Sequence, residues 1–153
     1  MGIANQNILP SHLAAVAGVI DPDAYAANTY TTGWINMADF GAIMAIIMAG
    51  DLGTSATIDA KLQQATDSGG SGAKDVTGKA ITQLTQAGSD SNKQVVINLS
   101  ADELDVANDF THVRLSVTIA TAASDMGAVV LGLHRRYGPA SGGDLASVDE
   151  IVS

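Results

Sequence analysis

The side chains able to bind metals or transfer protons are thinly spread along this chain of 153 residues. Its three histidines, His12, His112 and His134, have no local spacing of metal ligands, so a metal site built from them would depend entirely on the fold. We interpret each of them as solvated or satisfied by its neighbours. The chain contains no cysteine, which removes thiolate nucleophiles, thiolate metal sites and disulfides together.

Acidic residues gather in one short segment that contains Asp102, Glu103 and Asp105. Carboxylates suit a hard cation such as Ca²⁺, but the alternating acidic spacing and central glycine of an EF-hand loop are missing. A solvated acidic turn is therefore the better interpretation. The spacing from Ser100 to Glu103 is that of a capping box and predicts at most one helical turn.

Glycine-rich and serine motifs give no further chemistry. The segment Gly69-Gly70-Ser71-Gly72 lacks the Lys-Ser/Thr ending of a phosphate-binding loop, and no Gly-x-Ser-x-Gly elbow occurs. We interpret the segment as a flexible hairpin tip. We expect no catalytic, cofactor-binding or metal-ligating residues, and we interpret the chain as a protein without enzymatic activity.

Charge and composition narrow the class of partner. Seven Lys and Arg residues stand against 16 Asp and Glu residues, for a formal net charge of −9. This negative field repels phosphate, so we expect neither direct binding of nucleic acid nor attachment to an anionic membrane. The apolar run from Phe40 to Ala49 is too short to span a bilayer, which needs about 20 residues. We therefore expect the protein to act by presenting a surface and not by catalysing a reaction.

The elements that form this surface are predicted to be strands. Phe40–Ala49, followed by a Gly-Asp-Leu-Gly turn, is predicted to be a strand buried on both faces. Residues 56–63 alternate apolar and polar with a period of two, and so do residues 110–121, where His112 and Arg114 share the polar face. Further strands are predicted at residues 29–37, 75–86, 94–99 and 128–133, with polar turns at 66–73, 87–92 and 123–127.

Roughly six or seven strands with almost no helix predict an all-β fold, a single β-sandwich or jelly-roll-like domain. A parallel α/β fold would need amphipathic helices between the strands, and the sequence has none. The predicted domain covers residues 29–138. Residues 1–28 are predicted to be an N-terminal arm, and residues 139–153 a flexible C-terminal tail.

The predicted arm is rich in apolar side chains for a free end. A short helix capped by Ser11 and running from Leu13 to Ala17 and an extended segment packed on a neighbour fit the sequence equally well. In either form the arm would pack inside the subunit or across a seam between subunits. The candidate contact residues are Ile8, Leu9, Leu13, Val16 and Ile20.

Aromatic and basic side chains supply the other candidate contacts. Arg135, Arg136 and Tyr137 bring together two of the seven basic residues of an acidic chain. The simpler interpretation is a solvated strand end; the alternative is ion pairing with an acidic partner, which includes a second copy of the protein. Tyr30 is a candidate interface residue, whereas Trp34 is expected to pack in the core.

Four segments carry a resemblance to a known family. They are Phe40–Gly50, the strand and loop Lys-Leu-Gln-Gln-Ala-Thr-Asp-Ser at residues 61–68, Phe-Thr-His-Val-Arg-Leu at residues 110–115, and residues 127–137 with the ending His-Arg-Arg-Tyr. In this order they resemble small virion structural proteins of tailed bacteriophages, which are commonly encoded near the major capsid protein. The resemblance covers roughly residues 29–140.

The resemblance implies a small β-domain that assembles in many copies on a phage particle. Within that class we favour a capsid decoration, or cement, protein that is made in the host cytoplasm and binds the major capsid protein on the phage head. By analogy with other such proteins it would associate with itself as a trimer. The first alternative is a head–tail connector or tail component, which would form a ring. The second is a ligand-binding β-sandwich, for which six aromatic residues offer few stacking platforms.

Overall fold

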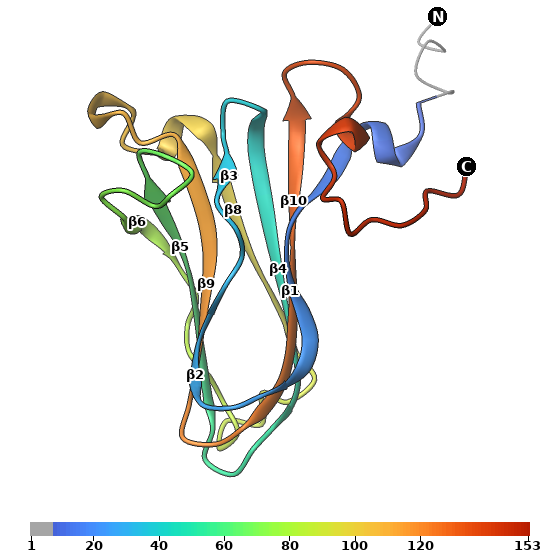
Figure 1. Ribbon diagram of the computed structural model, residues 1–153. Coiled ribbons are helices and arrows are strands. Elements are labelled where there is room, and N and C mark those ends of the chain that lie inside the picture. The colour runs from blue at the N-terminus through green and yellow to red at the C-terminus, as the bar shows by residue number, and fades with distance from the viewer. Residues whose placement is uncertain (1–7) are drawn as a thin grey trace, which may run out of the picture.

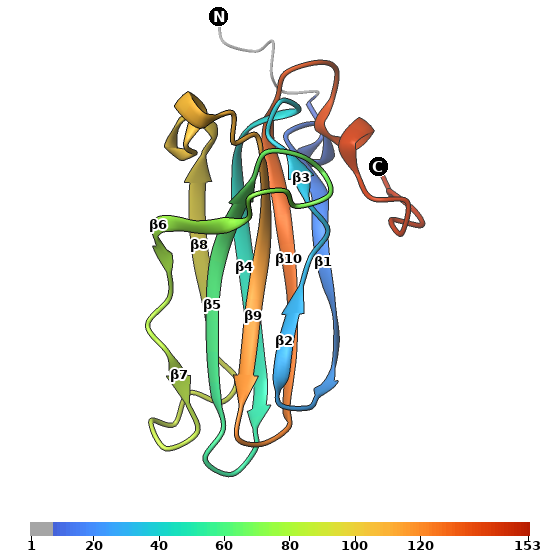
Figure 2. The same cartoon turned by 60° about the vertical axis from the view of Figure 1, so that its left-hand side comes forward.

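Two antiparallel β-sheets packed face to face form the body of the protein in a computed structural model that describes residues 8–153 (Figures 1 and 2). Sheet A has the strand order β1-β10-β4-β8, and sheet B the order β2-β9-β5-β6. Two short strands, β3 and β7, pair with β9 and β5. This arrangement confirms the predicted all-β sandwich.

The strands of sheet A are β1 (Ala14–Tyr25), β4 (Phe40–Leu52), β8 (Gln94–Ser100) and β10 (Ser124–Arg135). Those of sheet B are β2 (Asn28–Thr31), β3 (Ile35–Asn36), β5 (Thr57–Ala65), β6 (Lys74–Ala80), β7 (Leu84–Thr85) and β9 (His112–Ala120). The helical elements are single turns of 3₁₀-helix, η2 (Pro10–His12), η3 (Ala101–Glu103), η4 (Val106–Asn108) and η5 (Ala140–Gly143). Among the described residues no helix is long and apolar enough to cross a membrane.

The core lies between the two sheets and is aliphatic. Alternate residues of each strand point inward, as the period of two requires. Ile43 and Ile47 of β4 meet Ile58 and Leu62 of β5 in one buried cluster. This packing explains why a chain with few aromatic residues can still build a core.

Three strand predictions need correction. The strand predicted at residues 75–86 is divided into β6 and β7. The turn predicted at residues 123–127 lies largely inside β10, which begins at Ser124. Met126 is only 2% exposed, so its burial outweighs the turn preference of the Asp and Gly beside it. The strand predicted at residues 29–37 is divided into β2 and β3, with the buried Thr32 between them.

The N-terminal segment differs most from the prediction. Residues 14–25 form β1, a strand of sheet A paired along its length with β10, so the helix from Leu13 to Ala17 is wrong. Ala15 and Ile20 point into the core, and this burial fixes the segment as a strand. The predicted arm boundary at residue 28 therefore falls within the sandwich. The part of the arm before Ile8 lies outside the described residues.

The C-terminal segment docks beside β1 at least as far as Leu145. Ala140 of η5 is buried, and the Leu145 amide donates a 2.9 Å hydrogen bond to the Val16 carbonyl. The Val16 amide in turn donates a 2.7 Å hydrogen bond to Oδ1 of Asp144. The first part of the predicted flexible tail thus covers the edge of β1, and Figure 1 shows the C-terminal segment on that side of the sandwich.

Candidate functional site

The outer face of sheet B is polar. Lys61 forms a 2.8 Å ion pair with Asp75, and Nη2 of Arg114 donates a 2.9 Å hydrogen bond to Oε1 of Gln63. The Arg114 guanidinium also lies 4.5 Å from the centre of the Trp34 ring. Trp34, expected in the core, is therefore half-buried beneath an arginine. These groups satisfy one another and leave a solvated face.

The middle of the outer face of sheet A is the opposite, mainly apolar and without a charged side chain, while Asp125 and Arg135 lie at the two ends of β10. Its central row runs across all four strands in register, from Val19 through Val129 and Ile46 to Val96. Val96 is 51% exposed, and Ile46 and Val129 are half-buried only by their neighbours in the sheet. We define the sheet A face as Ala14, Val16, Val19, Ala42, Met44, Ile46, Met48, Gln94, Val96, Asn98, Ser100, Val129, Leu131 and Leu133.

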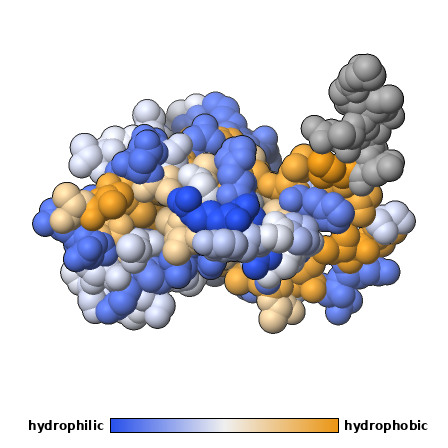
Figure 3. All heavy atoms as spheres, turned by 90° about the horizontal axis from the view of Figure 1, so that it is seen from above, coloured by the Kyte–Doolittle hydropathy of each residue, from blue (hydrophilic) through white to orange (hydrophobic). Residues whose placement is uncertain are grey.

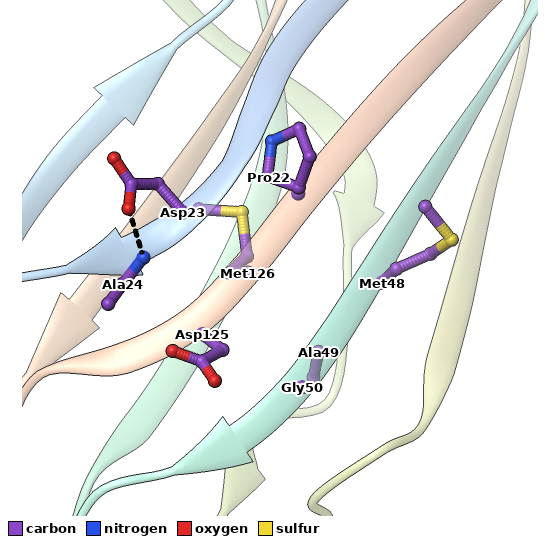
Figure 4. A pocket seen from close by; sticks show the side chains of 9 residues that line it. Pro22, Asp23, Ala24, Met48, Ala49, Gly50, Asp125 and Met126 are labelled. Carbon is purple, nitrogen blue, oxygen red and sulfur yellow. Dashed lines mark hydrogen bonds between the residues drawn. The ribbon is translucent and has the colours of Figure 1, made fainter.

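We call the end of sheet A at Leu52 and Ser124 its lower end, and the end at Phe40 and Arg135 its upper end, as they lie in Figure 1. A hollow of about 410 Å³ lies at the lower end of the sheet A face (Figure 4). Gly50 and Gly127 line it and let the chain pack closely there, since a Cβ at Gly50 would come within 2.8 Å of the Asp125 Cβ and one at Gly127 within 3.1 Å of Pro22. Pro22 and Met48 stand at its sides, and Asp23 and Asp125 bring two carboxylates to the same end. The hollow is thus apolar within and acidic at its rim.

Exposed apolar side chains also gather where η2 and η5 contact each other. We define the terminal cluster as Ile8, Leu9, Leu13 and Leu145, whose exposed fractions are 40%, 37%, 59% and 37%. The turns η2 and η5, which carry or adjoin these residues, contact each other. Figure 3, seen from above, shows hydrophobic residues concentrated on the side of the chain ends.

The structure divides the other predicted contact residues between interior and surface. Val16 lies on the sheet A face, whereas Ile20 is 5% exposed and points into the core. Tyr30 is half-buried against Tyr25, with 4.3 Å between ring centres, and its hydroxyl donates to the Ala26 carbonyl. Ile20 therefore contributes to the fold and has no surface to offer a partner.

The basic residues fall into two groups. All four lysines, Lys61, Lys74, Lys79 and Lys93, form ion pairs. Within residues 8–153 no carboxylate pairs with an arginine. Arg135 donates a 2.9 Å hydrogen bond to the Pro139 carbonyl, Arg136 is exposed, and Tyr137 is 80% exposed. Two uncompensated positive charges thus stand at the upper end of sheet A.

Lysine side chains form ion pairs with the acidic turn, at Glu103 and Asp105. Lys79 lowers the pKa of Glu103, and the Ser100 amide lowers it further by donating to the carboxylate. Lys74 likewise lowers the pKa of Asp105, with help from the Asn108 side chain. In the part of the chain that the structure describes, no group of three or more His, Asp or Glu residues is placed to hold a metal ion.

The sheet A face was missed as a surface by sequence reasoning. The run Phe40–Ala49 was interpreted as a strand buried on both faces, but only its inner side chains, such as Ile43 and Ile47, are covered within the subunit. The signal was present in the sequence: Val129, Leu131 and Leu133 repeat the same excess of apolar residues on β10. The periodicity could not say whether the second face is buried within one subunit or between two.

No protein-family model and no curated protein matches this chain. Among solved structures it is similar to a protein of broad bean stain virus, at 10% identity and a TM-score of 0.46 over 84% of this chain and 87% of that one. It is also similar to one from empty virus-like particles of cowpea mosaic virus (11%, 0.44, 84% and 81%). A third is the N-terminal cellulose-binding domain of a Cellulomonas fimi β-1,4-glucanase (14%, 0.44, 82% and 90%). These likenesses concern sandwich architecture alone.

Proposed function

We propose that this chain is a virion structural protein, and specifically a capsid decoration protein that binds the major capsid protein of a tailed bacteriophage. The observation that carries the proposal is the terminal cluster, which exposes four large apolar side chains at one end of an acidic molecule. Exposed apolar groups of this kind mark protein interaction sites. The phage-like segments at residues 40–50, 61–68, 110–115 and 127–137 supply the class of particle.

The proposed protein would stabilise the capsid by holding neighbouring capsomers together. An expanded capsid bears internal pressure, and a protein that bridges neighbouring capsomers adds buried area across seams that would otherwise open. A standard interface buries about 1,600 Å², and repetition over the shell multiplies the effect. The terminal cluster, in which Leu9 precedes η2 and Leu13 follows it, would supply the apolar centre of each contact.

A binding experiment with decoration-free phage heads tests this function. We expect the double substitution Leu9→Asp and Leu13→Asp to lower occupancy on heads at least about tenfold, since hot-spot contacts carry most of the binding energy. Val106→Asp is the matched control, because Val106 is as exposed as Leu13, at 59%, but lies outside the terminal cluster. Co-sedimentation with heads measures occupancy. Equal occupancy of all variants would contradict the proposed contact.

Cryo-electron microscopy of the same particles tests location. Density repeated over the capsid lattice is the expected result. Density confined to one vertex or to the tail would instead make the protein a connector or tail component, the alternative that a ring-forming β-domain fits equally well. A ligand-binding role has weaker support, because the one tryptophan, Trp34, already lies beneath the Arg114 guanidinium.

A further inference from the structure

We propose that a second copy of this chain covers the sheet A face, in a two-fold dimer whose axis crosses the strands. The lower end of one sheet A then lies against the upper end of the other. This dimer rests on the proposed function in one respect, because a virion protein present in many copies lies close to other copies of itself. Charge, area and geometry favour a second copy as the partner.

Charge favours a second copy at this face. Two molecules of net charge −9 repel each other wherever their carboxylates meet. The sheet A face as defined leaves out the ends of the strands and carries no Asp, Glu, Lys or Arg, so the middle of the sheet can meet a second copy without burying a charge. The outer face of sheet B, with Asp59, Lys61 and Arg114, has no such property.

The area of the face is that of a small dimer interface. Four strands about 4.8 Å apart and rows about 3.4 Å apart from Ala42 to Met48 give a projected area of roughly 450 Å². Two such faces bury roughly 900 Å² in total, which is the range of small specific interfaces, below about 1,200 Å². Sheets pack about 10 Å apart when their facing side chains interdigitate. The central row, with Val129 and Ile46, would become the core of this contact.

The two ends of sheet A carry complementary charges. The lower end has the hollow with Asp23 and Asp125 at its rim. The upper end has Arg135 and Arg136, neither of which forms an ion pair in the described structure. Asp144 also lies at the upper end, but its Oδ1 is turned toward β1 by the Val16 amide.

The register shows how these ends would meet. Leu131 stands midway along β10 between Gly127 in the hollow and Arg135 at the upper end. An axis that crosses the strands at Leu131 therefore brings Arg135 of each copy over the hollow of the other. One Arg135 donor already bonds to the Pro139 carbonyl, and a guanidinium has five, so donors remain for a carboxylate. An axis parallel to the strands would instead set arginine against arginine.

Sedimentation velocity of the full-length protein over a range of concentrations tests the dimer. We expect Ile46→Asp to raise the dimer dissociation constant more than about tenfold, because it buries a charge in the apolar centre. Thr57→Asp is the matched control, since Thr57 is half-buried on the outer face of sheet B, and it should leave the constant unchanged. Circular dichroism and thermal melting verify that each variant is folded.

Charge reversal at the two ends of sheet A tests the orientation without touching the apolar centre. Arg135→Asp with Arg136→Asp should weaken the dimer, and so should Asp23→Arg with Asp125→Arg. All four substitutions in one chain should restore it, because each reversed end then meets its complement. With the axis parallel to the strands, neither pair alone would weaken the dimer, and that result would overturn the proposed orientation.

The outcomes also separate this inference from the proposed function. A wild-type chain that stays monomeric at every concentration would overturn the dimer. If that monomer still binds phage heads and Ile46→Asp abolishes the binding, the capsid lattice occupies the sheet A face and the proposed function stands. A dimer that binds no particle would leave the inference intact and contradict the function. Binding of the monomer to neutral lipid vesicles would assign the face to a membrane and overturn the dimer.

Discussion

At the scale of the residue, one buried hydroxyl attaches the segment between β2 and β3 to β9. Oγ1 of Thr32 accepts a 3.1 Å hydrogen bond from the Leu115 amide and donates to the Gly33 carbonyl. Thr32→Val keeps the shape and removes the acceptor, so a buried amide loses its partner. We expect unfolding by denaturant to show a loss of about 1–3 kcal/mol.

Thr31→Val is the control for this prediction. Thr31 is exposed at the end of β2, next to Thr32, and its replacement should change stability by less than about 0.5 kcal/mol. Equal losses for the two variants would show that β-propensity or packing, rather than the Leu115 hydrogen bond, sets the cost.

At the scale of the element, the C-terminal segment is expected to protect the edge of β1. Its contacts end early: Asp144 and Leu145 bond to Val16, whereas Ile151 and Val152 are exposed. A chain that stops after Pro139 loses η5 and leaves Val16 with a free amide and carbonyl. Unpaired strand edges recruit other strands, so we expect a lower melting temperature and aggregation, seen by light scattering on heating.

A chain that stops after Val148 keeps the docked residues and is the control. It should melt and scatter light like the full-length protein. Aggregation of both truncated chains to the same extent would contradict the protective role of Asp144 and Leu145.

Sequence reasoning succeeded for elements whose pattern is local. The period of two at residues 56–63 and 110–121 predicted β5 and β9 because one face of each strand is wet. It failed for β1, where Ala14–Ala17 is compatible with helix and strand alike, and pairing with β10 decides the outcome. The candidate contacts divided similarly: Leu13 is exposed, whereas Ile20 serves the core, and no local signal distinguishes them.

At the scale of the whole molecule, stability is expected to depend on ionised carboxylates in two loops and on β6. Hydrogen bonds to Ser71 lower the pKa of Asp67, while Lys93 lowers that of Asp90 and Lys61 that of Asp75. In the unfolded chain these groups titrate near a pH of about 4. A folded-state pKa below the unfolded one means that the unfolded chain binds more protons on acidification, so stability falls with falling pH.

The expected result is a melting temperature that holds from neutral pH to about pH 5 and then decreases through pH 4 and below. Asp67→Asn with Asp90→Asn should lower the melting temperature at neutral pH and flatten this decrease, because the variant has fewer carboxylates to protonate. Asp149→Asn, in the exposed C-terminal segment, is the control and should keep the wild-type profile. Salt should weaken the wild-type effect, since exposed ion pairs are screened. A profile that rises on acidification below pH 4 would show that relief of the −9 net charge outweighs these loop contacts.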